Sequence, residues 1–217
     1  MKLLFISLGC DKNLVDSEEM LGMLAADGHQ IVDDEDEAEV IIVNTCCFIG
    51  DAKEESVNTI LEMAEKKKAG TCKVLIVTGC MAQRYKKEIS EEIPEVDAIL
   101  GTTSYGDIIK AVKEAEAGRH FEEYKSIDFL PNISGKRMLT TGGHFAYLKI
   151  AEGCDKHCTY CIIPKLRGSY RSVPMEQLVK EAQSLAEQGV KELILVAQET
   201  FAGRHMEICP GDLGSIG

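Results

Sequence analysis

Glu152-Gly-Cys-Asp-Lys-His-Cys-Thr-Tyr-Cys161 follows an apolar segment, residues 145–150, that reads as a strand. Its cysteines, Cys154, Cys158 and Cys161, have the spacing Cys-x3-Cys-x2-Cys. Three thiolates this close together at the end of a strand can hold three corners of a cubane iron–sulfur cluster. Because no fourth cysteine follows nearby, one iron would stay open and could bind a substrate or cofactor directly.

Other uses of clustered cysteines fit this stretch less well. A structural zinc site usually has four ligands, and His144 and His157 are the nearby candidates for a fourth. Two-cluster ferredoxins use a different spacing, with a further cysteine before a proline. Disulfides are not expected in a chain without a secretory signal. The spacing and its place after a strand favour a cluster with an open site, and zinc remains the alternative.

The segments around this stretch predict a second, partial domain. Residues 174–188 carry apolar residues at helical spacing, and residues 192–196 read as the next strand. A strand, a loop, a helix and a strand in this order are typical of the opening of a (β/α) barrel. We predict a linker over residues 119–141, this partial domain over residues 142–200, and an aberrant tail without periodicity over residues 201–217.

Residues 1–118 alternate short apolar runs with amphipathic stretches. The predicted strands are residues 3–8, 40–43, 73–78 and 98–100, and the predicted helices are residues 13–26, 51–68, 82–93 and 105–117. Strand–helix alternation of this kind implies a parallel sheet covered by helices on both faces. The predicted fold class is therefore α/β, with an N-terminal doubly wound parallel sheet followed by the start of an incomplete (β/α) barrel.

A second cysteine set comes from three separate strand ends. Cys10, Cys46 and Cys80 each lie one to three residues past a predicted strand. The carboxyl ends of parallel strands share one edge of the sheet, so these cysteines can converge there. A single cysteine in such a place would most simply be a buried core residue. Three in equivalent positions favour a second cluster, again with three thiolate ligands.

Composition limits the compartment and the partners. The chain has 217 residues, nine cysteines and a net charge of −12, and no apolar run approaches the roughly 20 residues needed to cross a bilayer. The start, residues 1–10, resembles a lipoprotein signal, but its apolar stretch is too short, and a first buried strand is the better interpretation. Cysteines in such a chain suggest metal or redox chemistry in a reducing cytoplasm. An acidic chain is a poor general nucleic-acid binder and suits a basic protein partner better.

Taken together, the two cysteine sets resemble the methylthiotransferase family of radical S-adenosylmethionine (SAM) enzymes. The matching text is Ser7-Leu-Gly-Cys-Asp-Lys-Asn-Leu-Val-Asp-Ser-Glu18, Asn44-Thr-Cys46, Thr78-Gly-Cys80, Gly153-Cys-Asp-Lys-His-Cys-Thr-Tyr-Cys-Ile-Ile-Pro164 and Arg167-Gly-Ser-Tyr-Arg-Ser172. The resemblance covers about residues 1–200. Six cysteines fall where this family has its cluster ligands.

Within the family, the first and last of these motifs favour one branch. Residues 7–18 and 168–172 resemble the branch that modifies an aspartate on protein twelve of the small ribosomal subunit. The branch that modifies an adenosine in transfer RNA more typically has an aromatic residue before Gly-Cys and Gln-Met-Asn after it. The resemblance therefore implies a ribosomal-protein substrate, with transfer RNA as the alternative.

The resemblance also implies the cofactors. Cys154, Cys158 and Cys161 would hold a [4Fe-4S] cluster that binds SAM and donates an electron to it, so that a 5′-deoxyadenosyl radical takes a hydrogen from the aspartate β-carbon. The residues Cys10, Cys46 and Cys80 would hold a second [4Fe-4S] cluster, which carries the sulfur for transfer. An electron donor such as flavodoxin or ferredoxin would be needed. Tyr160 would lie near the SAM adenine, or else pack against the barrel.

The region of the cysteine loop is locally basic, and the chain departs from the family pattern after it. Lys156, Lys165, Arg167 and Arg171 either meet the cofactor carboxylate or are solvated. The match stops near residue 200, which suggests a truncated gene or a frameshift. Two β/α units cannot close a barrel, so we expect exposed sheet edges and apolar surface. Most of the expected SAM pocket would be missing, so we expect this chain to lack methylthiotransferase activity. The alternative is a non-catalytic metal-binding fragment.

Overall fold

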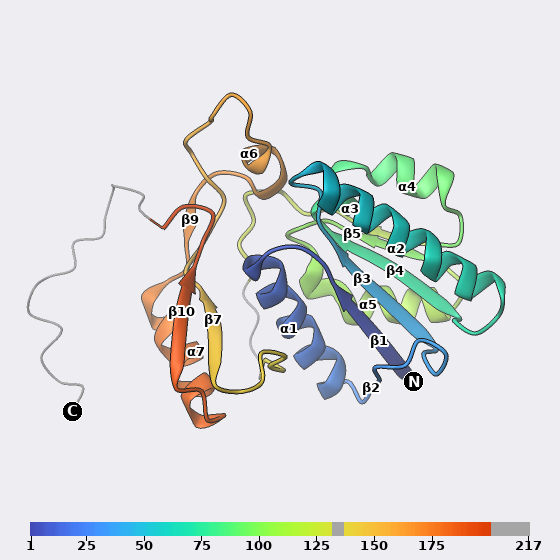
Figure 1. Ribbon diagram of the computed structural model, residues 1–217, viewed down its shortest axis with the longest axis horizontal. Helices are drawn as coiled ribbons and strands as arrows, with labels where there is room; N and C mark the ends of the chain where they lie inside the picture. The colour runs from blue at the N-terminus through green and yellow to red at the C-terminus, as the bar shows by residue number, and fades with distance from the viewer. Residues whose placement is uncertain (132–136, 201–217) are drawn as a thin grey trace, which may run out of the picture.

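A computed structural model describes residues 1–131 and 137–200 (Figure 1). The first part of the chain forms a six-stranded, wholly parallel sheet with the order β2-β1-β3-β4-β5-β6. Its strands are β1 (Lys2–Ser7), β2 (Gln30–Ile31), β3 (Val40–Thr45), β4 (Val74–Gly79), β5 (Ala98–Leu100) and β6 (Phe121–Glu123). The predicted parallel α/β sheet is confirmed.

Helices cover both faces of this sheet because its central strands are apolar on both sides. They are α1 (Asp11–Ala26), α2 (Gly50–Lys68), α3 (Cys80–Arg84), α4 (Lys86–Glu92), the 3-10 turn η1 (Tyr105–Asp107) and α5 (Ile108–Glu116). Within β3, Ile41 and Val43 pack in one core with residues of α2, α3 and α4. Val40 and Ile42 pack in a second core with residues of α1 and α5. The alternation of side chains along each strand thus builds the two cores.

The second part of the chain is smaller and packs beside α1 (Figure 1). It contains β7 (Phe145–Lys149), β8 (Ala151–Glu152), α6 (Ile163–Arg167), β9 (Arg171–Ser172), α7 (Met175–Glu187) and β10 (Glu192–Val196). The strands β7 and β10 pair in parallel, and a small core of Ala146, Leu185 and Val190 lies under α7. This is the β/α opening that the sequence predicts.

The exposed surface of β10 agrees with an incomplete barrel. Within the described residues, β10 pairs only with β7. Leu193, Ile194 and Leu195 expose 36%, 37% and 56% of their surfaces, although they belong to a strand of apolar sequence. In a parallel sheet, a further strand and helix normally cover apolar residues of this kind.

Three local details differ from the expectations. The predicted helix over residues 82–93 is two short helices, α3 and α4, because Tyr85 between them has φ −118° and ψ 33°, outside the helical region. The short strand β2 was not expected, and β6 extends the sheet to Glu123, beyond the predicted boundary at residue 118. The expected tail, residues 201–217, lies outside the described residues, as does Cys209.

Gly79, at the end of β4, tests the packing of the strand ends. Its φ of +92° disfavours any residue with a Cβ, and a Cβ there would lie 2.5 Å from the Thr45 carbonyl oxygen. Gly70 has a similar φ of +86° but nothing within 4 Å of such a Cβ. We expect Gly79→Ala to lower the free energy of unfolding by about 1–3 kcal/mol more than Gly70→Ala, because only Gly79→Ala adds a steric clash to the backbone strain.

Urea unfolding of the two variants and the unchanged chain, followed by circular dichroism, measures this difference. Equal losses in the two variants would show that β3 and β4 are not in such close contact at their carboxyl ends.

Candidate metal centres

The first cysteine set lies at the carboxyl edge of the large sheet. Cys10 follows the end of β1 and precedes α1, Cys46 directly follows β3, and Cys80 begins α3 directly after β4. The three strands are neighbours in the order β1-β3-β4. The structure therefore brings the three strand ends together as the sequence predicts, because successive parallel strands point the same way.

Asn13, in the first turn of α1, ties these strand ends to one another. Its side-chain amide donates hydrogen bonds to the carbonyl oxygens of Leu8 and Thr45, both at 2.9 Å. Its carbonyl oxygen Oδ1 lies 3.9 Å from the Cys80 sulfur. Asn13 is 1% exposed, so these contacts are shielded from water. One side chain thus contacts the segments of all three cysteines.

The surroundings of these thiols differ. Cys46 and Cys80 are each 7% exposed, whereas Cys10 is exposed. Burial raises the pKa of the Cys80 thiol to about 11, and the nearby Arg167 guanidinium opposes that shift. A buried thiol is a poor ligand until a metal ion or a cation compensates its negative charge. Cys80 therefore lies in a place where a thiolate needs a positive neighbour, and Arg167 is one.

The second cysteine set lies on the loop that follows β8. Cys154 is anchored, because its N–H donates to the Gly168 carbonyl at 3.1 Å. The Cys161 N–H donates to the Cys158 carbonyl at 2.9 Å, which folds the end of the loop into a turn. Cys158 is exposed, and the other two are half-buried. The loop has the exposure that a site open to a small molecule requires.

The chemistry of both donor sets fits iron–sulfur clusters, because each offers three thiols at the end of a strand or sheet edge. Within residues 1–131 and 137–200, no three His, Cys, Asp or Glu side chains lie close enough together to hold a metal ion as they stand. The assignment of Cys10, Cys46, Cys80, Cys154, Cys158 and Cys161 as ligands thus remains a prediction.

The position of His144 disfavours a zinc site that would use it. His144 directly precedes β7, whereas the cysteine loop lies beyond the other end of that strand. Five residues of strand separate the two ends by roughly 16 Å. His144 is therefore too far from the cysteine loop to act as a fourth ligand, which leaves His157 within the loop itself.

A hollow of about 740 Å³ lies beside the second cysteine set. Its lining includes Cys158, Tyr160 and Cys161 from the loop, and Phe48 and Ile49 from the segment after Cys46. Tyr160 is 90% exposed, so it does not pack against the strands and helices of the second part that the structure describes. This tyrosine is free to contact a cofactor or substrate that enters the hollow. Its predicted place near the SAM adenine is untested.

A second cavity, of about 830 Å³, lies away from the cysteines. It is formed between α1, η1 and α7, and Glu19, Tyr105, Lys149 and Glu181 contribute to its lining. Burial raises the pKa of Glu19 to about 7, and the charge of Lys149 opposes that shift. None of the six predicted cluster ligands lines this cavity, so it is not the candidate site.

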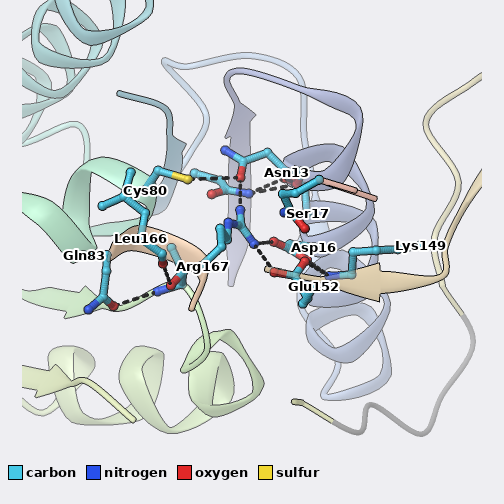
Figure 2. Close-up of polar contacts among 12 residues, drawn as sticks. Asn13, Asp16, Ser17, Cys80, Gln83, Lys149, Glu152, Leu166 and Arg167 are labelled. Carbon is cyan, nitrogen blue, oxygen red and sulfur yellow. Dashed lines mark hydrogen bonds and ion pairs between the residues drawn. The ribbon is translucent and has the colours of Figure 1, made fainter. Parts of the chain in front are cut away.

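The sequence analysis missed a buried polar cluster between the two parts of the chain. Asp16 accepts a hydrogen bond at 2.8 Å from Arg167 and another from Lys149, and Glu152 lies 3.4 Å from Arg167 and 3.3 Å from Lys149 (Figure 2). All four side chains are at most 7% exposed. Two positive and two negative groups here compensate each other's burial.

Arg167 is thus neither solvated nor free for a cofactor carboxylate, and this part of the expectation is wrong. The guanidinium is 2% exposed and also donates to Asn13 Oδ1 (Figure 2). The sequence did carry a signal for this cluster. Asn13 and Asp16 lie on the same face of α1 as the apolar residues Met20 and Leu24, so polar side chains were to be expected on the buried face. Lys156 pairs with Glu199 at 2.5 Å, and Lys165 contributes to the hollow beside the cysteine loop.

Comparison with known families gives two matches along the chain. Residues 2–101 match the model of the uncharacterized protein family UPF0004. Residues 148–208 match the model of the radical SAM superfamily. The order of the two matches is the order of the two cysteine sets.

Curated relatives are similar over most of this chain. A protein of Lachnoclostridium phytofermentans named ribosomal protein uS12 methylthiotransferase RimO is 65% identical over 200 residues, which are 92% of this chain and 46% of the relative. Proteins of the same name from Clostridioides difficile and Acetivibrio thermocellus are 54% and 52% identical, covering 92% and 93% of this chain and 45% and 46% of the relatives. The chain spans about half the length of these relatives.

A solved structure supports the fold. The cobalamin-dependent S-adenosylmethionine radical enzyme OxsB, with aqua-cobalamin bound, matches with a TM-score of 0.54 at 15% identity, over 91% of this chain and 34% of that chain. At this identity the likeness concerns the fold alone. In sequence, the chain is similar to about half the length of relatives named as methylthiotransferases, and it matches the UPF0004 model followed by the radical SAM superfamily model.

Proposed function

We propose that this chain is the N-terminal part of a methylthiotransferase that acts on ribosomal protein uS12. The relatives that are 50–65% identical to it carry that name. The observation that carries the proposal is the pair of cysteine sets, whose segments are connected through Arg167 and Asn13 in the buried cluster. The target within uS12 is the β-carbon of an aspartate.

The described residues have separate roles in this function. Cys154, Cys158 and Cys161 would hold the [4Fe-4S] cluster at which SAM binds, and Cys10, Cys46 and Cys80 would hold the second one. When bound, these groups and SAM supply the radical chemistry and the sulfur. Tyr160 and Phe48 line the hollow beside the cysteine loop, where they would contact a bound cofactor or a substrate side chain.

The partners follow from the same proposal. The substrate is a basic ribosomal protein, which suits a chain with net charge −12. An electron donor such as flavodoxin or ferredoxin would supply electrons, and the setting would be the cytoplasm. In the described ranges, no helix has both the length and the apolar character to cross a membrane. Transfer RNA remains the alternative substrate, and the test below includes it.

Removing each cysteine set should remove one cluster. Anaerobic reconstitution of the 217-residue chain should give about eight irons per chain, since each cubane holds four. The triple variant Cys10→Ala, Cys46→Ala and Cys80→Ala should give about four irons, and so should the triple variant of the other set. Iron and acid-labile sulfide are measured by colorimetric assay.

Cys72→Ala is the matched control. Cys72 is buried, but it lies at the amino end of β4, where its thiol contacts the Val74 carbonyl oxygen at 3.0 Å. This variant should keep the full iron content. Stoichiometric zinc instead of iron, or iron content that neither triple variant changes, would contradict the cluster assignment.

Residues 1–200 should support transfer to uS12 once the rest of the barrel is supplied. In a chimera, they replace the matching segment of the Lachnoclostridium phytofermentans relative. The reduced chimera with SAM should add one methylthio group to uS12 and none to transfer RNA, as seen by mass spectrometry of both. The 217-residue chain alone should modify neither, because within the described residues β10 pairs only with β7 and its apolar side chains stay partly exposed.

The chimera with Cys46→Ala is the inactive control, and the chimera with Cys72→Ala should stay active. Modification of transfer RNA in place of uS12 would transfer the assignment to the other branch of the family. Cleavage of SAM by the 217-residue chain alone would refute its expected inactivity.

A further inference from the structure

Arg167 is connected to both cysteine sets, to one through the main chain of the turn that follows it and to the other through its side chain. It ends α6, and the next residue, Gly168, accepts the N–H of Cys154 at 3.1 Å. Its guanidinium crosses to the other part of the chain, where it binds Asp16 at 2.8 Å and also Asn13. The main chain of this turn therefore holds the second cysteine set, and the side chain reaches the first.

Asn13 carries the contact onward to the first cysteine set. The same side chain that accepts from Arg167 donates to Leu8 and Thr45, which directly flank the Gly9-Cys10 turn and Cys46. Its Oδ1 also lies 3.9 Å from the Cys80 sulfur. A shift of the guanidinium would therefore move the anchor shared by the three strand ends.

The α6 helix is fixed to the first part of the chain by a second contact. Thr102 donates its hydroxyl to the Leu166 carbonyl oxygen at 2.7 Å, and its N–H donates to Gln83 at 3.2 Å. Gln83 belongs to α3, the helix that begins at Cys80. Arg167 is thus held both by its own side-chain contacts with Asp16 and Asn13 and by the main-chain contact of the preceding residue, Leu166.

We propose that Arg167 is the positioning residue that holds the two cysteine sets in fixed relation and places a permanent positive charge beside Cys80. The proposed role of this charge rests on the proposed function, since the charge would stabilise an anionic cluster held by Cys10, Cys46 and Cys80. The positional part does not depend on any metal. Lys149, Glu152 and Asp16 complete the buried cluster, so loss of the guanidinium leaves an excess of negative charge there.

The chain offers a matched control in Arg137. This arginine is also buried, at 5% exposure, and also bridges the two parts, with Glu18 at 3.0 Å and Glu181 at 2.5 Å. It contacts none of the segments that carry the six cysteines in the interactions described for it, which are with Glu18, Glu181 and the Tyr147 carbonyl. Arg137→Gln therefore removes an equivalent ion pair without touching the proposed coupling.

Hydrogen exchange of the metal-free 217-residue chain tests the positional part. Arg167→Gln should speed exchange at least about tenfold both at Cys154, whose N–H binds Gly168, and at Leu14, whose N–H binds the Cys10 carbonyl. Arg137→Gln should leave both amides near the rates of the unchanged chain. Equal effects of the two variants, or a change at only one of the two amides, would overturn the inference.

The reduction potential of the first cluster tests the electrostatic part. It is measured in chains whose Cys154, Cys158 and Cys161 are alanine, so that a single cluster reports. Arg167→Gln should shift the midpoint to more negative values, because reduction adds negative charge beside the lost cation. Arg167→Lys should keep the potential of the unchanged protein, and Arg137→Gln should not shift it. A potential that Arg167→Gln leaves unchanged would overturn this part.

Asp16→Asn separates the positional effect of Arg167 from the effect of its charge. It also provides a second test if Arg167→Gln does not fold. It keeps the arginine but removes its main anionic partner, so exchange at Cys154 and Leu14 should rise without a negative shift in potential. If the chain binds no iron at Cys10, Cys46 and Cys80, the proposed function fails. The positional inference is then still decided by the exchange rates of the metal-free chain.

Discussion

The ion pair between Asp16 and Arg167 joins two parts of the chain that have separate apolar cores. Leu166 packs in the core of the large sheet, but Ala146, Leu185 and Val190 form their own small cluster under α7. Removing one partner of such a buried pair typically costs about 3–5 kcal/mol, because the other charge is left buried without compensation. The relation between the two parts therefore depends on directional polar contacts as well as on the packing of Leu166 in the core of the large sheet.

The same contacts connect the fold to the site. Asn13 accepts from Arg167 and donates to the ends of β1 and β3, so the arrangement of the strand ends and the arrangement of the two parts are not independent. Parallel strands bring Cys10, Cys46 and Cys80 to one edge, but they do not by themselves orient that edge toward the loop of Cys154. The polar cluster, the Thr102–Leu166 hydrogen bond and the packing of Leu166 hold the two parts together.

The smaller part is stabilised by its neighbour as much as by its own packing. Its two paired strands and one long helix bury few apolar side chains, and β10 keeps three apolar residues partly exposed. Arg137 and Arg167 each attach it to α1, at Glu18 and at Asp16 respectively. Two buried arginines packed against different sides of α1 explain why this helix also buries Asn13, Asp16 and Glu18.

The sequence alone determined the α/β class, most strand and helix positions and both cysteine sets, because periodicity and close spacing are local properties of the chain. It also indicated the strand-end convergence of Cys10, Cys46 and Cys80, since parallel topology places all strand ends on one edge. Only the tertiary structure decided that Arg167 is buried against Asp16 and that Tyr160 stays exposed. The burial of Arg167 depends on a pairing between residues 151 positions apart, and local patterns carry no information about which distant charge will compensate a buried one.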